Sequence, residues 1–255
     1  MGALPDTDVI VFYDIPSDTP SKAWSPSTWK TRYALNLKGL PYRTQWVEYP
    51  DIAALLQSFG LEPTDPGTIL PYTLPAIYDP RTKRAVAESA KIAAYLDDTY
   101  PDTPAVLPKE LRAFQAAFQH GFGTVVQPAV LPLFLPRTLP ILTPASQPYF
   151  RRTREQMFGT KMEEICPPPQ YAAQWAEIER AFGVLAGWMD DAGDGRFTML
   201  GGAVTHTDLS VAGWLVWMRI VTGKESEEWR ALEGWHGGRW KRLMDLVEPW
   251  YDYSR

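Results

Sequence analysis

The chain has 255 residues, which is long enough for two modest domains that each bury a core of their own. Hydrophobic residues make up 45%, charged residues 22%, and the mean hydropathy is -0.25, as is typical of a globular protein. The net charge of -5 offers no basic surface for phosphates, so nucleic acid is not an expected partner.

Cysteine usage and the absence of targeting signals favour the cytoplasm. Cys166 is the only cysteine, so no disulfide can form within the chain, which suits a reducing compartment. Residues 1–8 carry two acids and lack the basic region that opens a secretory signal. No apolar run approaches the roughly 20 residues that span a bilayer. We therefore expect a cytoplasmic protein with no membrane partner.

The first hundred residues alternate strand and helix patterns. Residues 9–13 form a β-branched and aromatic run that predicts a buried strand, and residues 14–25 form a loop. Pro26 suits the first turn of a helix, and Gly39 suits its end. The alternation of polar and apolar residues over 44–49 predicts a second strand.

A further helix, a hairpin and a last helix follow. Residues 52–59 predict a weak helix, which leads into a turn-rich linker that ends at Pro71. Residues 74–78 and 84–87 predict an antiparallel pair, and Ser89 is expected to cap the helix after it. The resulting order, β-α-β-α-β-β-α, is the thioredoxin-like arrangement.

A proline-rich step then marks an expected domain boundary. Strand signals stop after residues 100–104. We assign residues 1–100 to an α/β thioredoxin-like domain and residues 105–255 to an all-helical domain. The helices expected in the second domain are 108–127, 148–165, 171–192, 207–222 and 238–247.

Between the first two of these helices, prolines recur every four residues from Pro128 to Pro148. This spacing argues against a regular helix, because each proline removes an N–H group and clashes with the preceding turn. The residues between the prolines are mostly apolar, which argues against a free linker. We therefore predict an ordered extended loop that lies on apolar surface.

Three local motifs resemble those of the glutathione transferase superfamily. Ser25–Leu40 (SPSTWKTRYALNLKGL) is similar to the superfamily's active-site serine and first helix. Thr73–Ala76 resembles its cis-proline turn, and Glu88-Ser89 resembles its acidic-serine pair. The strings SPSTWKTRYALNLKG and ILPYTLPAIYD are most similar to bacterial β-aryl etherases and fungal FuA-class transferases. The resemblance is specific over about residues 9–100 and implies the two-domain cytosolic glutathione transferase fold.

The resemblance implies that Ser25 stabilises the thiolate of glutathione. A free thiol has a pKa near ~8.5 and is a weak nucleophile until it loses its proton. A hydroxyl at the positive end of a helix favours the thiolate by donating a hydrogen bond to it. Ser27 is the alternative catalytic residue, and the residues by themselves also allow Ser25 to be only an N-cap. No cysteine lies in this stretch, so thiol–disulfide chemistry by the protein is not expected.

The glutathione-binding residues implied by the resemblance are Leu74, Pro75, Glu88 and Ser89. A cis Leu74–Pro75 bond would leave the backbone N–H and C=O of Leu74 free for the cysteinyl backbone of glutathione. Ser89 and the first N–H groups of its helix would hold the γ-glutamyl carboxylate, and Glu88 would accept from the γ-glutamyl ammonium. The alternatives without a ligand are that the Leu74–Pro75 bond is an ordinary trans bond, and that Ser89 only caps its helix while Glu88 is a solvated acid beside it.

Other polar residues carry less information. Lys38, Arg43 and Gln57 are all candidates for the glycine carboxylate of glutathione, and no spacing selects one of them. Thr205–Asp208 predicts a capping box before a continuous apolar helix, within which His206 is expected at the surface. No histidine has a partner at ligand spacing, so no metal is expected.

The pocket for the second substrate is expected between the Ser25 loop and the helical domain. Its candidate lining consists of Phe114, Phe118, His120, Phe122 and the proline-rich segment. The resemblance implies a homodimeric enzyme that transfers or exchanges glutathione on hydrophobic aromatic electrophiles, with aryl-ether, peroxide and phenolic compounds as candidates and detoxification as the role. The alternatives are a ligandin-type binder of flat aromatic compounds and a non-catalytic interaction module.

Overall fold

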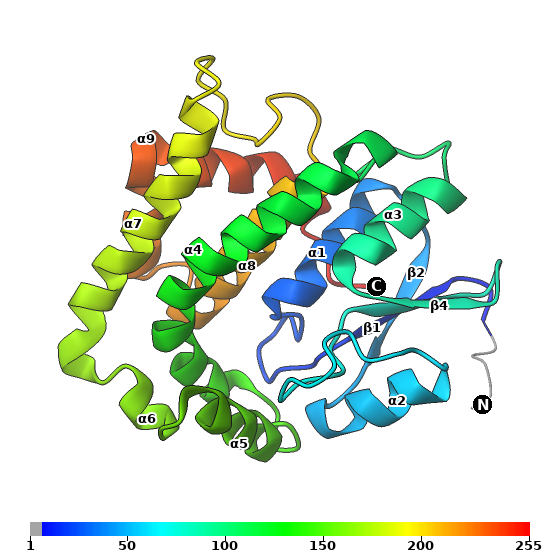
Figure 1. The fold of residues 1–255 in the computed structure, drawn as a ribbon, viewed down its shortest axis with the longest axis horizontal. Coiled ribbons are helices and arrows are strands. Elements are labelled where there is room, and N and C mark those ends of the chain that lie inside the picture. Colours follow the sequence, from blue (N-terminus) through cyan, green and yellow to red (C-terminus); the bar gives the residue numbers. More distant parts are fainter. Residues whose placement is uncertain (1–6) are drawn as a thin grey trace.

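The computed structural model describes residues 7–255, so most of the segment inspected for a secretory signal lies outside the described residues. Its strands form one four-stranded mixed sheet in the order β2-β1-β3-β4 (Figure 1). Strand β1 runs parallel to β2 and antiparallel to β3, and β3 and β4 form a hairpin. The strand bounds are β1 Ile10–Asp14, β2 Tyr42–Trp46, β3 Ala76–Asp79 and β4 Arg84–Ala87.

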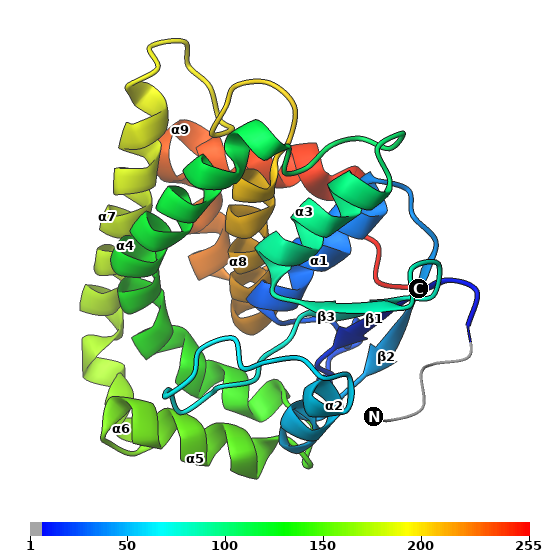
Figure 2. The same ribbon diagram turned by 45° about the vertical axis from the view of Figure 1, so that its right-hand side comes forward.

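Helices cover both faces of this sheet. Helices α1 (Pro26–Leu37) and α3 (Ser89–Thr99) lie on one face, and α2 (Ile52–Ser58) lies on the other (Figures 1 and 2). Alternate residues of β1 serve the two faces, as the period of a strand requires. Phe12 belongs to the apolar cluster with residues of α1 and α3, and Tyr13 belongs to the cluster that includes residues of α2.

The rest of the chain is helical, so the expected fold class is confirmed. Helix α8 lies at the centre of the molecule and packs on α1, α4 and α9 (Figure 2). No helix in the described part of the chain is long and apolar enough to cross a membrane. The bounds are α4 Arg112–Thr138, α5 Gln147–Phe158, α6 Met162–Ile165, α7 Tyr171–Asp190, α8 His206–Thr222 and α9 Glu227–Val247. Single 3-10 turns occur at Tyr49–Asp51, Lys109–Leu111, Leu139–Ile141, Pro168–Gln170 and Glu248–Trp250.

The prediction of an extended loop over 128–148 is wrong for its first half. Helix α4 continues through Pro128, Pro132 and Pro136 to Thr138. Residues four apart advance only about 40° around a helix, so the missing N–H groups fall along one strip, which is not buried. Carbonyls that lose their partner there can bind water, and burial of the opposite face offsets about 3 kcal/mol per interior proline. That buried face includes Val126, Ala129, Val130, Leu133 and Phe134.

Other elements also differ from expectation, and the helix expected over 148–165 is divided into α5 and α6. The second strand covers Tyr42–Trp46 rather than 44–49, because it pairs along the full length of β1. Ser89 is the first residue of α3 and Glu88 is its N-cap, so the predicted cap lies one residue too late. The helix expected over 238–247 corresponds to the second half of α9, which follows a break of non-helical backbone over Trp235–Gly238, and a separate helical stretch before this break starts at Glu227.

Helix α8 approaches the start of α1 more closely than a side chain would allow. A Cβ atom placed on Gly213 would lie 2.7 Å from the carbonyl oxygen of Pro26 and 3.5 Å from the backbone nitrogen of Lys30. Every residue of α8 from 206 to 218 is buried. The capping box predicted at Thr205–Asp208 is present and fixes where α8 begins. The start of α1 is therefore seated directly on the central helix.

His206 is fully buried, so the expectation of a surface position was wrong. Its backbone N–H donates to the carbonyl of Val106 over 2.7 Å, which draws the ring into the core. Burial, together with the smaller effect of nearby Lys30, lowers the pKa of the His206 imidazole to about 3. Burial raises the pKa of Asp208 at the same helix start. His206 is consequently neutral in the folded protein at pH 7.

The close approach of α8 to α1 predicts that Gly213→Ala destabilises the protein. The added methyl group would meet a backbone oxygen, and overpacking of this kind costs about 1–3 kcal/mol. Urea unfolding measures the change. Gly187→Ala in α7 is the matched control, because a Cβ atom there meets nothing within 4 Å. Replacing a helical glycine at such a place should be neutral or stabilising by up to about 1 kcal/mol. Equal losses in the two variants would contradict the packing argument.

The lowered pKa of His206 predicts an acid-sensitive core. An unfolded histidine titrates near ~6.5, so below that pH the unfolded chain binds a proton that the folded chain does not, and stability falls toward the folded pKa. Between pH 6.5 and 4.5 this loss should be roughly 2 kcal/mol, and His206→Asn should lack it. The opposing contribution of Asp208 is common to both proteins and cancels in the difference. Urea unfolding at the two pH values provides the test, and parallel pH dependences would refute it.

Candidate functional site

A cavity of about 290 Å³ opens between the sheet-bearing part of the chain and its helices. Its walls come from the β1–α1 loop, the turn before β3, and helices α4, α5 and α8. Aromatic rings dominate the lining and include Trp24, Tyr49, Tyr149, Phe150, Trp214 and Trp217. A concave, largely aromatic space with a few polar groups suits a small organic ligand.

The loop that carries Ser25 is held at both of its ends. The fully buried pair of Arg32 and Asp14 joins the end of β1 to α1 over 2.8 Å. In the middle of the loop, the Asp18 N–H donates to the carbonyl of Ile141, beyond α4, over 2.8 Å. The cavity wall that contains Ser25 is therefore preorganised by contacts within the protein.

A second set of contacts joins the two parts of the chain below the cavity. The Glu48 carboxylate accepts hydrogen bonds from the hydroxyls of Thr143, at 2.6 Å, and Ser146, at 2.5 Å. The backbone N–H of Tyr49 donates to the Ser146 hydroxyl over 3.0 Å. These bonds hold the start of α2 against the start of α5.

Ser25 and Ser27 both line the cavity at the start of α1. Ser25 is buried and occupies the N-cap position, but its hydroxyl makes no capping hydrogen bond. Its carbonyl instead accepts from the Trp29 N–H over 3.0 Å. The Ser25 hydroxyl is thus available to a ligand at the positive end of the helix.

The Leu74–Pro75 peptide bond is cis, and Leu74 lines the same cavity as the two serines. Within the described residues, the N–H and C=O of Leu74 form no backbone hydrogen bond. The carbonyl of Pro75 accepts from the Glu88 N–H over 3.2 Å, which attaches the turn to the start of α3. The predicted cysteinyl and γ-glutamyl positions are therefore neighbours.

Pro75, Glu88 and Ser89 do not themselves line the cavity. Glu88 has a φ of 73°, in the left-handed region, and its carboxylate pairs with Lys91. That pair is partly solvent-exposed, so it is weak and open to exchange with a ligand ammonium. Ser89 stands at the first position of α3, where its N–H and hydroxyl belong to the positive end of the helix.

None of the three candidates for the glycine carboxylate lines the cavity. Lys38 is buried, and its ammonium donates to Asp97 over 2.7 Å and to the carbonyl of Pro104 over 3.0 Å. Arg43 and Gln57 are solvent-exposed. Among the described residues there is no group of three or more His, Cys, Asp or Glu side chains that could hold a metal ion.

The aromatic residues expected to line the pocket lie closer to the N-terminus of α4 than the residues that line the cavity. Phe118 and Phe122 are buried in the helical core, and Phe114 and His120 are exposed. The residues of α4 that line the cavity are Gln127, Leu131 and Leu135. The proline-rich segment contributes to the pocket as expected, but as a helix.

Among the described residues that line the cavity, Arg154 of α5 is the one charged residue, and the sequence analysis did not identify it. It is buried beside Tyr49, whose pKa is raised by burial despite this cation. Its sequence context, Arg-Arg-Thr-Arg, resembles an ordinary solvated helix face. No short-range signal distinguishes this arginine from its neighbours.

Comparison with known proteins gives consistent matches over both parts of the chain. The families described as "Glutathione S-transferase, N-terminal domain" and "Glutathione S-transferase, C-terminal domain" match residues 24–99 and 113–250. A glutathione S-transferase-like protein of Aspergillus flavus, ustS, is 32% identical, with 94% of this chain and 90% of the relative covered.

Solved structures give the same result. The glutathione S-transferase CsGST63524 of Ceriporiopsis subvermispora, in complex with glutathione, is 46% identical with a TM-score of 0.93, over 96% of this chain and 98% of that one. GSTFuA3 of Phanerochaete chrysosporium is 41% identical with a TM-score of 0.89, over 96% and 98% of the two chains. With its thioredoxin-like sheet, its cis-proline turn and these matches, the chain belongs to the glutathione S-transferase family.

Proposed function

We propose that this protein is a serine-type glutathione transferase in which Ser25 activates the thiol of bound glutathione. The observation that carries the proposal is the free Ser25 hydroxyl in the same cavity as the free backbone groups of Leu74. Leu74 would bind the cysteinyl backbone, and Glu88 and Ser89 would bind the γ-glutamyl end. The structure of CsGST63524, which is 46% identical to this chain, is a complex with glutathione and supports this co-substrate.

The chemistry follows from the charge on sulfur. A hydroxyl donor and the positive end of α1 both favour the thiolate over the thiol, so more of the bound glutathione is nucleophilic at neutral pH. The thiolate then attacks an electrophilic carbon, and the leaving group departs as the carbon–sulfur bond forms. Because the cavity is walled by rings, the electrophile that we propose is a hydrophobic aromatic compound.

The resemblance to FuA-class transferases and β-aryl etherases supports four further parts of the proposal. We propose that the protein acts on aryl ethers or peroxides, that it detoxifies phenolic compounds, that it is cytoplasmic and that it is a homodimer. Residues 1–100 would form the glutathione-binding domain and residues 105–255 the domain that supplies the aromatic pocket.

A ligandin-type binder is the second candidate. The same aromatic walls would hold a flat compound by stacking without any reaction, and such stacking needs no activated sulfur. The two candidates differ in one respect, since only the transferase depends on the Ser25 hydroxyl.

We expect free glutathione to stabilise the protein in proportion to its concentration. A ligand that binds only the folded state adds RT ln(1 + [L]/Kd) to stability, so the melting temperature should rise through the millimolar range. Differential scanning fluorimetry measures the shift. Cysteinylglycine, which lacks the γ-glutamyl group, serves as the control and should have a smaller effect. An unchanged melting temperature in millimolar glutathione would remove the basis for the proposal.

Ser25→Ala should slow glutathione transfer at neutral pH about ten- to a hundredfold. Loss of a neutral donor to a charged sulfur costs about 1.5–3 kcal/mol, which appears in the pKa of bound glutathione and in kcat. The affinity for glutathione should hardly change, because the contacts at Leu74, Glu88 and Ser89 remain. Stopped-flow titration of the thiolate absorbance and steady-state kinetics provide the measurements.

Ser27→Ala, at the second residue of α1, is the matched control and should have a much smaller effect. If Ser27→Ala is the damaging change, the catalytic serine is assigned two residues too early. If neither serine matters while aromatic ligands still bind tightly, the binder is the correct candidate.

A further inference from the structure

Arg154 is a buried cation without a protein carboxylate beside it. Its residue is 8% exposed, and within the described residues no acid lies within ion-pair distance. One terminal nitrogen donates to the Thr153 hydroxyl over 2.8 Å, and the other lies 3.4 Å from the Tyr49 hydroxyl. An arginine has five N–H donors, so most of its donor capacity is not used by the protein.

Aromatic rings surround this guanidinium. Its central carbon lies 4.2 Å from the ring centre of Phe150 and 5.1 Å from that of Tyr49. The negative faces of such rings stabilise a cation when water is excluded, but they do not neutralise its charge. A buried charge that lacks an opposite charge is costly, so this site favours an anion.

The cavity lining has no acidic group that would repel an anion. Among the described residues that line it there is no aspartate or glutamate.

We propose that Arg154 binds the carboxylate of a ligand in this cavity. A guanidinium matches a planar carboxylate with two parallel hydrogen bonds, and the rings around it accept an aromatic or aliphatic body behind that group. Two sources supply this chemistry: the glycyl carboxylate of glutathione, or a carboxylate on the aromatic compound. The first source rests on the proposed function, whereas the second requires only that the cavity binds aromatic acids.

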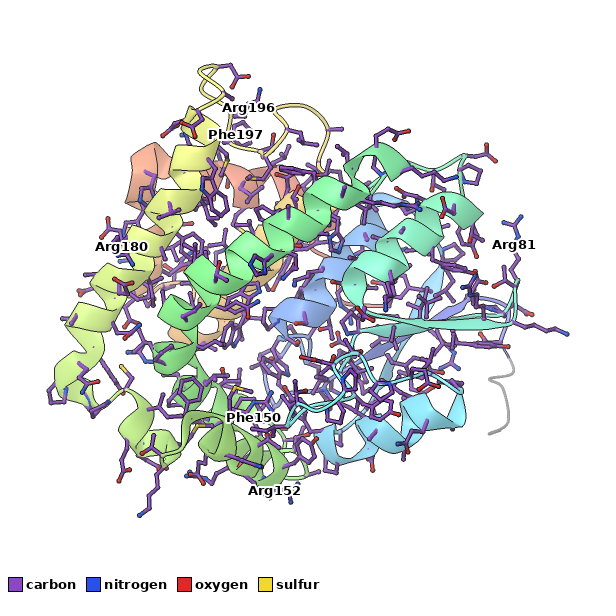
Figure 3. All side chains as sticks on the ribbon, viewed as in Figure 1. Arg81, Phe150, Arg152, Arg180, Arg196 and Phe197 are labelled. Atoms are coloured by element: carbon purple, nitrogen blue, oxygen red, sulfur yellow. The ribbon has the colours of Figure 1, made fainter. Side chains whose placement is uncertain are left out.

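The test compares Arg154→Met with a control on the same helix. Arg154→Met keeps most of the apolar stem and removes the charge, and Arg154→Lys keeps the charge but not the paired donors. Arg152→Ala is the matched control, since Arg152 is exposed at the outer edge of α5, whereas Phe150 lies on the side of α5 toward the molecule's interior (Figure 3). Melting temperatures show whether each variant is folded before binding is measured.

The first arm uses calorimetric titration with glutathione and γ-glutamylcysteine, which lacks the glycyl carboxylate. If the glycyl group is the source, Arg154→Met weakens glutathione binding about tenfold or more and leaves γ-glutamylcysteine unchanged. Arg154→Lys should recover part of the loss. This result supports the proposal and identifies glutathione as the source.

The second arm uses 1-naphthoate and the neutral 1-naphthamide, titrated in the absence of glutathione. If the aromatic compound is the source, Arg154→Met weakens naphthoate binding about tenfold or more and leaves naphthamide unchanged. This arm can be interpreted even if the wild-type protein does not bind glutathione. Failure of the proposed transferase function can therefore be distinguished from failure of the proposed carboxylate binding by Arg154.

Two outcomes overturn the proposal. One is that Arg154→Met changes neither glutathione nor naphthoate binding. The other is that it weakens charged and neutral ligands alike, or no more than Arg152→Ala does, which is the signature of a purely structural residue.

Discussion

The contact between Gly213 and the carbonyl of Pro26 governs the geometry of the whole site. Only a residue without a side chain lets α8 come so near to the start of α1. On one side of the contact stand Ser25 and Ser27, and on the other stands Trp214, which follows Gly213 directly. The distance between the serine wall and the tryptophan wall of the cavity is thus set by one backbone approach in the core.

Polar contacts also fix the loops that form the cavity walls. The buried Arg32–Asp14 pair and the Glu48 contacts hold loops whose own sequences would allow many conformations. Replacing one partner would leave a buried group unsatisfied, which is more costly than the net gain from forming the bond. The cavity walls are therefore fixed in the folded protein, and a ligand that enters has little ordering cost to overcome.

What could be predicted from sequence was what depends on short-range rules. The β-α-β order and the Thr205–Asp208 box involve residues that are close in the chain, whereas the cis Leu74–Pro75 turn was expected from the resemblance to glutathione transferases. The buried position of His206 and the helical path through Pro128 depend on packing by distant elements, so local propensity gave the wrong answer. Arg154 and most of the aromatic lining of the cavity could not be predicted for the same reason, because the lining residues come from segments as far apart as Ile15 and Trp217.

Arg154 is an example of a residue whose environment depends on distant elements, and that environment determines which ligands it can bind. Arg151 pairs with Glu155 and Glu163, and Arg152 is exposed, so three neighbouring arginines of one helix have three different environments. In Arg154, aromatic faces take the place that a carboxylate would otherwise fill. An incoming anion then has no protein acid to displace, and its full attraction to the guanidinium contributes to binding. A buried cation held by aromatic rings and two neutral hydroxyls, with no carboxylate beside it, is thereby selective for a charged ligand while its surroundings remain largely apolar.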